Sequence, residues 1–543
     1  MTKTLFIGLD GATFTVLDRL IADLPDEGIT MPFMKRFVDG GARAKLLSTP
    51  NPLTPPAWTT IMTGRSPGNH GVYDFIRAEE KGDEVYFTLY DARDIATETI
   101  WSIATRKGKN VVALNFPLTA PPRPNSGISV PGFVPWKHLR RNVAPSGLFD
   151  RLKEIDGFNP KELAWDFDLE KQAMEKLSEE ETERWVKYHL PREEQWFRIA
   201  EHLMDTEQPE LMAVMFDGTD KIQHQAWRFL DPRLPRDNWG EWEYSMRRVC
   251  LSYFRALDGY IERLVELAGP DSRVFMASDH GFTASTEVLR INAFLEEKGY
   301  LQWADYGDDA DIAERRSNAN FAAVDWKKTT AYCRTPSSNG IYIRVADRPG
   351  AFGIPPDEYH EFRERIITDL ESLVDDVTGE RIVSKIMRRE DVFAGEFMHE
   401  APDLTLVLRD FGFVSIRNLH PPLLQRDEIV GTHHPDGVML ANGVGIAATD
   451  ELEPRDIVDV APTLLYSLGL PVPKDFEGVV PEAFFVDEFL EAQPITIGKP
   501  TSRTNGGQVD KSAIKAGAVD EVEMDEQEKE AIMEQLQMLG YMD

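Results

Sequence analysis

Two Asp–His pairs in the sequence have the residue types and spacing of metal ligands. Asp279 and His280 are adjacent and are followed by Gly281, which lets the backbone turn away sharply. Asp220 and His224 lie four residues apart, so a helix would place both side chains on one face, within reach of one cation. Carboxylate oxygens and imidazole nitrogens are ligands that zinc and manganese accept. For Asp220 and His224 alone, an ordinary surface pair explains the spacing equally well.

Three further positions could complete such a site. Asp10 follows the apolar run that ends at Leu9, although an Asp–Gly step after a strand is more often just a turn. Asp217 competes with Asp220 for the role of ligand. Late in the chain, His433 is a candidate and its neighbour His434 is its rival.

Thr54 offers a hydroxyl within the stretch Asn51–Gly71, where the chain turns into a helix. Pro55 suits a first helical position, and Gly64 can end the helix. A hydroxyl at the positive end of a helix can cap it, or it can act as a nucleophile whose developing negative charge the dipole and a metal ion stabilise. Taken alone, the capping role is the commoner one. The potential ligands elsewhere in the chain favour the nucleophile.

The composition limits how a metal could be held. With 543 residues, 42% of them hydrophobic, the chain can form about two to four domain-sized units or one elaborated α/β domain. Its two cysteines, Cys250 and Cys333, lie far apart in the sequence, which excludes a disulfide framework and a thiolate zinc cluster. Any metal must therefore be bound by histidines and carboxylates.

The charge and the hydropathy pattern limit the partners and the location. A formal charge of −32 disfavours a nucleic-acid polymer, because such binding relies on Lys and Arg that neutralise phosphates. A small phosphate ester stays compatible, since a bound dication reverses the local field. No run of about 18 apolar residues could span a bilayer, and the opening MTKTLFIGLD lacks the layout of a signal peptide. These features predict a cytoplasmic protein without a membrane span; they leave the oligomeric state open.

Short apolar runs alternate with helical patterns in the first half of the chain. This alternation is typical of βαβ units, so we expect an α/β fold with a mainly parallel central sheet flanked by helices. Ligands bind such sheets at the carboxyl ends of the strands. The predicted strands are Lys3–Leu9, Asn110–Asn115, Leu211–Phe216 and Arg273–Ser278, and the predicted helical regions include Thr13–Gly40, Trp101–Arg106, Arg247–Ala268 and Asp456–Leu468.

Changes in composition divide the chain into a core, an inserted cap and a tail. We expect the catalytic α/β core to comprise residues 1–281 and 431–485, with a helical insertion at about 137–202. Strand-like pieces around a helix at Asp357–Val374 predict an inserted α+β cap over 282–430, which would choose the substrate. Residues 495–543 are expected to form an acidic tail, partly disordered and with a terminal helix.

The candidates occur in an ordered set of motifs. The set comprises GLDG at Gly8–Gly11, TPPAWTTIMTGRSPGNHG at Thr54–Gly71, DKIQH at Asp220–His224, SDHGF at Ser278–Phe282 and GTHHPDG at Gly431–Gly437. In this order they resemble the type I phosphodiesterase/nucleotide pyrophosphatase family, within the alkaline phosphatase superfamily. The resemblance covers roughly residues 1–480, and it implies an alkaline-phosphatase-like fold.

The resemblance also implies a site and a reaction. It implies two divalent metal ions, zinc with manganese as the alternative, and hydrolysis of small phosphodiesters or pyrophosphates. Thr54 would attack phosphorus and form a phosphothreonine intermediate. The implied first metal site consists of Asp220, His224 and His433, and the second of Asp10, Asp279, His280 and the Thr54 oxygen.

The sequence departs from the family pattern beside the nucleophile. Nucleotide pyrophosphatases of the family generally carry an asparagine three residues after the threonine, where this chain has Ala57. In those relatives the asparagine helps to hold a phosphate oxygen. In this chain a backbone N–H at the helix start, Lys221 or Asn339 could take that role instead. Tyr73 could stack on a base or an aryl group, or it could pack beneath its loop.

Several other functions fit the same scaffold. The alternatives are a phosphomonoesterase, a phosphonate hydrolase, a phospho-group transferase, and a binding protein without turnover. A sulfatase is disfavoured, because relatives that cleave sulfate esters use a modified cysteine or serine followed by a Pro and Arg signature. Thr54–Ala57 does not provide that signature.

Overall fold

The computed structural model describes residues 2–81, 84–163, 177–304, 321–346, 348, 350–375, 377–449 and 451–502. Residues 164–176 of the predicted helical insertion lie outside the described residues. So do residues 503–543, which include the predicted terminal helix of the acidic tail.

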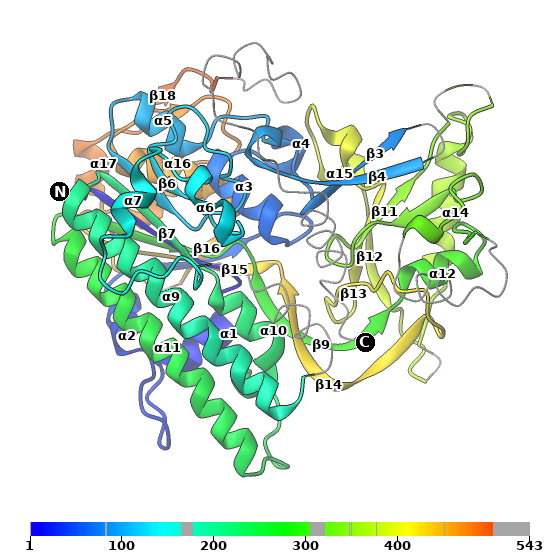
Figure 1. Ribbon diagram of the computed structural model, residues 1–543, viewed down its shortest axis with the longest axis horizontal. Helices are drawn as coiled ribbons and strands as arrows, with labels where there is room; N and C mark the ends of the chain where they lie inside the picture. The colour runs from blue at the N-terminus through cyan, green and yellow to red at the C-terminus, as the bar shows by residue number, and fades with distance from the viewer. Residues whose placement is uncertain are drawn as a thin grey trace.

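The core is built on one sheet of eight strands, as expected for a mainly parallel α/β fold (Figure 1). Neighbouring strands pair in parallel except at β15, which runs antiparallel to both β2 and β8. In spatial order the strands are β16 (Glu451–Asp456), β2 (Ala42–Leu47), β15 (Asp436–Gly443), β8 (Arg273–Ala277), β1 (Thr4–Leu9), β7 (Leu211–Phe216), β5 (Val111–Leu114) and β6 (Ile128–Val130).

Helices cover both faces of this sheet, and the alternation of side chains along β1 shows how. Leu5 and Ile7 pack into the apolar core on one face, whereas Phe6 packs into the core on the other. The first face is covered by α1 (Phe14–Ile21), α2 (Pro32–Asp39), α9 (Glu179–Glu207), α10 (Gly218–Leu230) and α11 (Glu241–Ala268). The second face is covered by α3 (Thr54–Thr63), α5 (Ile100–Arg106) and α16 (Val460–Ser467).

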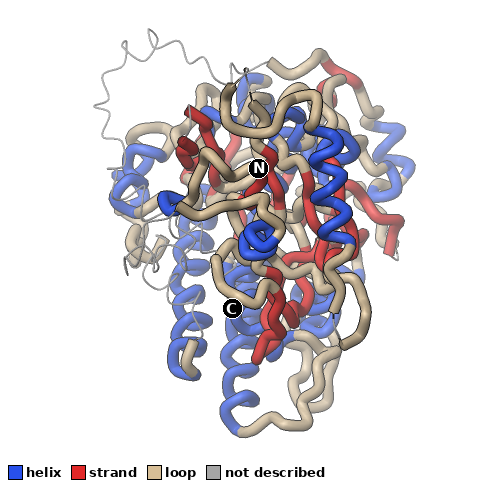
Figure 2. The backbone as a smooth tube through the Cα atoms, turned by 90° about the vertical axis from the view of Figure 1, so that its right-hand side faces the viewer, coloured by secondary structure: helices blue, strands red, loops and turns tan. Residues whose placement is uncertain are grey.

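A second, smaller unit has an antiparallel sheet and a hydrophobic core of its own, and we call it the cap. Figure 2, in which the right-hand side of Figure 1 faces the viewer, looks onto it. Its strands, in spatial order, are β10 (Ala331–Cys333), β11 (Gly340–Ile343), β13 (Leu404–Leu408) and β12 (Val383–Arg388). Its core includes residues of α12 (Ile291–Glu297) and α14 (Tyr359–Glu371).

A two-stranded ribbon of β9 (Gly281–Leu289) and β14 (Leu423–His434) joins the core to the cap. At the core end His433 pairs with Phe282, and at the cap end Leu423 pairs with Leu289. The expected domain boundaries at 281/282 and 430/431 therefore fall inside this ribbon. As a result, the chain leaves for the cap directly after His280 and returns from it with His433.

Other elements connect or flank these units. The hairpin of β3 (Ile76–Lys81) and β4 (Glu84–Leu89) reaches the cap, where Phe87 packs against the cap core. The remaining elements are α4 (Pro67–His70), α6 (Trp136–Asn142), α7 (Leu148–Leu152), α15 (Arg389–Val392), α17 (Asp487–Ala492), β17 (Val472–Pro473), β18 (Ile497–Gly498) and short 3-10 turns.

Two predicted helical regions are divided in the structure. Thr13–Gly40 contains α1 and α2, separated by a turn in which Gly28 has a φ of 62°. The region predicted as a helix from Asp456 begins with a 3-10 turn at Ile457–Asp459 before α16. Pro462 lies in the first turn of α16, where its missing N–H would have no partner inside the helix in any case.

Candidate metal centre

The topology of the sheet brings four of the candidate residues to one edge. Strands β8, β1 and β7 are neighbours and run in parallel, so their carboxyl ends lie side by side. Asp279 and His280 follow β8 after Ser278, and Asp10 directly follows β1. Asp220 lies in the first turn of α10, immediately after β7.

The other half of the sheet brings His433 and Thr54 to the same edge. Because β15 is antiparallel to β8, its start lies where β8 ends, and His433 precedes that start. Thr54 opens α3 after β2, which runs in the same direction as β8. Two tethers fix the loop before Thr54: the Ser48 hydroxyl donates to the Asp279 carbonyl at 2.6 Å, and the Pro52 carbonyl lies 2.8 Å from His433 Nδ1.

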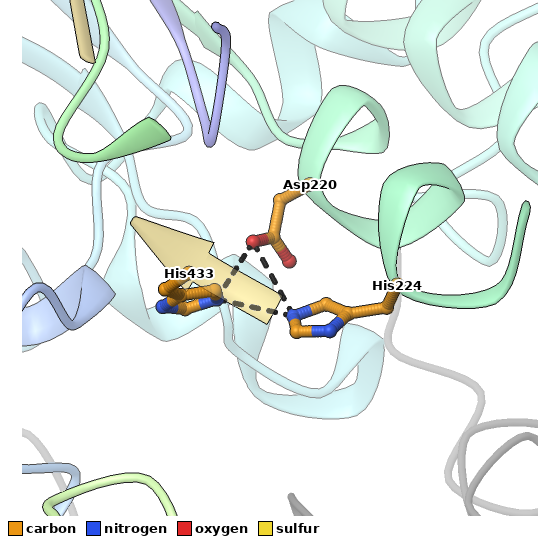
Figure 3. A group of neighbouring side chains, drawn as sticks. All are labelled: Asp220, His224 and His433. Carbon is orange, nitrogen blue, oxygen red and sulfur yellow. Dashed lines mark hydrogen bonds and ion pairs between the residues drawn. The ribbon is translucent and has the colours of Figure 1, made fainter. Parts of the chain in front are cut away.

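The first group of potential ligands consists of Asp220, His224 and His433 (Figure 3). Nε2 of His433 lies 3.1 Å from Asp220 Oδ1 and 3.1 Å from His224 Nε2. His224 Nε2 lies 3.5 Å from the same carboxylate oxygen. The three side chains thus point toward one common point.

The second group consists of Asp10, Asp279 and His280. His280 Nε2 lies 3.2 Å from Asp279 Oδ2 and 3.7 Å from Asp10 Oδ1. The two groups also adjoin each other, because His280 Nε2 is 3.9 Å from Asp220 Oδ1 and the rings of His280 and His433 stack with centroids 3.6 Å apart.

Backbone carbonyls determine which nitrogen of each histidine faces the centre. Nδ1 lies 3.1 Å from the Gly431 carbonyl in His224, 2.8 Å from the Pro52 carbonyl in His433 and 3.1 Å from the Gly281 carbonyl in His280. A carbonyl can only accept, so each Nδ1 carries a proton, and in the neutral form of the ring Nε2 presents a lone pair to the centre. Two such lone pairs 3.1 Å apart repel each other unless a cation lies between them.

The carboxylates of the two groups likewise require a positive charge nearby. Burial, together with the charges of Asp279 and Asp220, raises the pKa of Asp10 well above its ordinary value. Burial likewise raises the pKa of Asp279 from 3.8 to about 8. At Asp220, burial favours the neutral form, but the charged forms of His224 and His433 outweigh it and lower the pKa.

Four buried polar atoms of the two groups lack a hydrogen-bond partner among the described residues. They are Asp10 Oδ1, Asp220 Oδ1, Asp279 Oδ2 and His280 Nε2. Convergent, unsatisfied carboxylate and imidazole atoms are the chemistry that divalent cations require. The residues therefore fit two divalent metal ions, one in each group.

Thr54 is the first residue of α3, and Leu53 occupies the N-cap position. The structure therefore does not give Thr54 the capping role. The residue is buried, with 6% of its surface exposed, and no hydrogen-bond partner of its hydroxyl is found within the described part of the chain. Gly64, with a φ of 64°, ends the helix, and its N–H donates to the Thr60 carbonyl.

The structure separates the candidates from their two rivals. Asp217 Oδ1 accepts from Arg192 Nη1 at 2.8 Å and from Asn115 Nδ2 at 3.1 Å, so this carboxylate is used by an ion pair. His434 accepts from the Asp436 N–H through Nδ1, and its ring packs on Phe411. Neither residue belongs to the two ligand groups.

Two of the three predicted substrate-binding residues make hydrogen bonds within the protein. The Asn339 carboxamide donates to the Gly412 carbonyl at 3.1 Å and accepts from the Val414 N–H at 2.9 Å, so it holds a cap loop. Tyr73 donates to the Phe397 carbonyl at 2.8 Å and packs beneath its loop. The third, Lys221, is buried one residue after Asp220. A substrate contact of any of the three stays a prediction.

Sequence reasoning missed an aromatic side chain at the centre of the site. The Phe282 ring is buried and lies 4.8 Å from the His224 ring and 5.2 Å from the His433 ring. A Cβ at Gly11, whose φ is 66°, would come within 2.6 Å of it, and one at Gly431 within 3.0 Å. The glycines of two motifs therefore leave space for this ring. Their presence in the motifs was a sequence signal for a bulky side chain at this place.

Helix α9, which lies in the predicted insertion, also positions the site. No local sequence pattern indicated this role. Arg192 holds Asp217, and Glu193 Oε1 accepts from the Gly218 N–H at 2.6 Å. Trp185 Nε1 donates to the Lys221 carbonyl at 2.9 Å. These three contacts fix the turn between β7 and α10, which positions Asp220.

The comparisons with known proteins identify the family. The family model described as type I phosphodiesterase/nucleotide pyrophosphatase matches residues 4–436. The chain belongs to this family. A comparison with curated protein sequences gives no match.

Solved structures are similar to this member of the type I phosphodiesterase/nucleotide pyrophosphatase family in fold. The phosphonoacetate hydrolase from Sinorhizobium meliloti 1021, in complex with phosphonoformate, has a TM-score of 0.53 and 17% identity over 86% of this chain and 95% of that chain. The alkaline phosphatase PafA has a TM-score of 0.51 and 13% identity over 89% of this chain and 98% of that chain. The predicted family and fold class are therefore confirmed.

Membership in this family makes the chain a hydrolase of the phosphodiesterase/pyrophosphatase type, as predicted. The family supports phosphoester hydrolysis on this scaffold. Among the described residues, no helix is long and apolar enough to cross a membrane.

Proposed function

We propose that this protein hydrolyses small phosphodiesters or pyrophosphates with Thr54 as the nucleophile and two divalent metal ions, zinc with manganese as the alternative. One observation carries this proposal: unsatisfied buried ligand atoms of two groups converge at the sheet edge where α3 begins with Thr54. Asp220, His224 and His433 would hold one ion. Asp10, Asp279, His280 and the Thr54 oxygen would hold the other.

In the proposed reaction the phosphoryl group passes first to Thr54 and then to water. Bound dications would neutralise the carboxylates, lower the pKa of the Thr54 hydroxyl and stabilise charge on the departing oxygen. The Thr54 oxygen then attacks phosphorus, and the bond to the alcohol or phosphate leaving group breaks as a phosphothreonine forms. Attack by water on that phosphorus releases the phosphoryl product and restores the hydroxyl. The positive end of the α3 dipole favours the negative charge that develops on Thr54.

The surroundings of Thr54 suit this role. Because Leu53 is the N-cap, the threonine oxygen is not committed to the helix. The tethers at Ser48 and Pro52 hold the preceding loop to one residue of each ligand group. Such fixation lets the nucleophile meet the phosphorus without a large loss of freedom.

The test uses purified protein loaded with zinc and a panel of phosphate esters. We expect about two metal ions per chain and faster hydrolysis of an activated diester than of the matching monoester. Thr54→Ala should bind both ions but lose turnover, and Thr54→Ser should keep part of it. Full activity of Thr54→Ala would contradict the mechanism. A metal-loaded wild type that is inert to diesters, monoesters and phosphonates alike would favour a binding protein.

A further inference from the structure

A loop of the cap reaches the first ligand group. It comprises residues 410–414, and its Phe413 ring lies 4.7 Å from the His433 ring and 6.3 Å from the His224 ring, measured between ring centroids. Phe413 is only partly buried, so part of its surface stays open to a ligand. The cap thus places an apolar side chain beside two of the three ligands of this group.

Hydrogen bonds on both sides of Phe413 hold this loop in place. The Asp410 carboxylate accepts from the Thr286 N–H of β9 at 2.8 Å. After Phe413, the Val414 N–H donates to the Asn339 carboxamide at 2.9 Å, which ties the loop to the cap at the start of β11. Phe413 is therefore fixed to both the ribbon and the cap sheet. A side chain held by such elements can select between substrates, because its position does not adapt to each of them.

The proposed reaction places the leaving group of the ester on the same side. In a displacement at two metal ions, one ion binds the attacking oxygen and the other binds the leaving oxygen. Thr54 is assigned to the second group, so the leaving oxygen belongs to the first. The side chains of the first group are 25% exposed at His224, 8% at Asp220 and 4% at His433. The rest of the leaving group therefore extends past His224, where Phe413 lies.

The loop suits an apolar leaving group better than a charged one. The N–H groups of Phe411, Gly412 and Val414 already donate to oxygen atoms of the protein. From 411 to 414 the backbone therefore offers an anion at most the N–H of Phe413. A phosphate leaving group would carry charges that a phenyl ring cannot neutralise, and their desolvation is costly. An alkyl or aryl leaving group instead gains free energy by covering the ring.

We infer that Phe413 determines specificity for the leaving group, and that it favours phosphodiesters of apolar alcohols or phenols over pyrophosphates. This inference rests on the proposed function and narrows its substrate class. The P–O bond to the alcohol or phenol breaks as the bond to Thr54 forms, and water then displaces Thr54. One diester and one water thus give the free alcohol or phenol and a phosphate monoester.

The experiment uses two substrates that deliver the same methylphosphoryl group to Thr54. Methyl 4-nitrophenyl phosphate has an aryl leaving group, whereas dimethyl diphosphate, with one methyl group on each phosphate, has methyl phosphate as its leaving group. For the zinc-loaded wild type we expect kcat/KM to be at least about tenfold higher for the aryl ester. That factor corresponds to one good aromatic contact.

The ratio of the two kcat/KM values separates specificity from mere support of the ligands. Phe413→Ala should lower this ratio by about tenfold and keep the wild-type zinc content. Phe413→Arg should lower it further, because a guanidinium binds a phosphate leaving group. Phe411→Ala is the matched control, since the Phe411 ring of the same loop packs on His434, which is outside both ligand groups. In this control the ratio should stay within about twofold of the wild type.

The outcomes distinguish the inference from the proposed function. If the wild type hydrolyses the diphosphate as fast as the aryl ester, only the inferred specificity is wrong. The same conclusion follows if Phe413→Ala slows both substrates equally, with or without loss of a zinc ion, because the ring then only supports the ligands. If the zinc-loaded wild type hydrolyses neither substrate, the proposed function itself fails. Should Phe413→Arg fail to fold, Phe413→Ala decides alone.

Discussion

The two ligand groups occupy the same sheet edge but differ in charge and exposure. The first group has one carboxylate and two histidines, and the His224 side chain is 25% exposed. The second has two carboxylates and one histidine, and the His280 side chain is 0% exposed. The first group is therefore exposed to solvent at His224, whereas the His280 side chain of the second group is completely buried.

This difference shows in the protonation of the carboxylates. In the first group His224 and His433 lower the pKa of Asp220 despite its burial. In the second group burial and neighbouring carboxylates raise the pKa of Asp10, and burial raises that of Asp279. The second group thus depends more strongly on a dication for charge compensation. It is also the group to which we assign the nucleophile.

Removal of a carboxylate from the second group should have the largest effect on activity. We expect Asp279→Asn to lose one of the two metal ions and to lower kcat by roughly 10³-fold or more, the upper range for loss of a contact to a developing charge. Steady-state kinetics and metal analysis of the same sample measure both. If Asp279→Asn binds a single ion and still turns over as fast as the wild type, the second group is not required for catalysis.

The difference in exposure predicts a difference in chemical rescue. His224→Ala and His280→Ala should each lower kcat by at least about 10²-fold, because even loss of an outer-shell partner costs 10–100-fold. Added imidazole can reach the position of His224, which is partly exposed, but not that of His280. Activity should therefore return with imidazole in the first variant only. Equal rescue of both variants would show that the two groups are equally open.

The raised pKa of Asp279 predicts how the chelated protein responds to pH. The folded chain holds this proton more tightly than the unfolded chain, because the pKa rises from 3.8 to about 8. The stabilisation from this group is therefore full below pH 3.8 and is lost as the pH rises through about 8.

Thermal unfolding in a chelator at pH 5 to 9 tests this dependence. Relative to Asp279→Asn, the chelated wild type should lose a few degrees of Tm as the pH rises, since about 1 kcal/mol moves the Tm of larger domains by about 2–4 °C. Zinc should restore more stability at pH 8 than at pH 5. A difference between wild type and variant that does not change with pH would contradict the raised pKa.

The smallest effect is expected at the neighbour of a ligand. His433→Gln should lose the first metal ion and most of the turnover. His434→Gln should keep both ions and stay within about twofold of wild-type kcat, the scale of a neutral substitution, because its ring lies on Phe411 outside both groups. If His434→Gln loses a metal ion, the composition of the first group is wrong.

Local sequence patterns predicted the elements that end at the site. The apolar run Leu211–Phe216 coincides with β7, and the acids after β1 and β8 lie at one edge because parallel strands end on the same side. The spacing of Asp220 and His224 placed both on one face of α10. Each of these features is determined by a short stretch of chain and could therefore be predicted from the sequence.

Contacts between distant segments could not be predicted in this way. Asp217 and Asp220 look alike in sequence, and only the ion pair with Arg192 of α9 excludes the former. Likewise, Asn339 looks like a free amide until the loop at Gly412 and Val414 folds onto it. The position of Phe413 beside His433 arises from the same kind of long-range packing.

The central claim is that Thr54 attacks phosphorus at a two-metal centre. It is tested most directly by acid quenching of the zinc-loaded protein during turnover of an activated diester, followed by peptide mass spectrometry. We predict a phosphoryl group on Thr54 in the wild type and none in Thr54→Ala. Steady turnover by the wild type with Thr54 unmodified, or a phosphoryl group on another residue, would contradict the account.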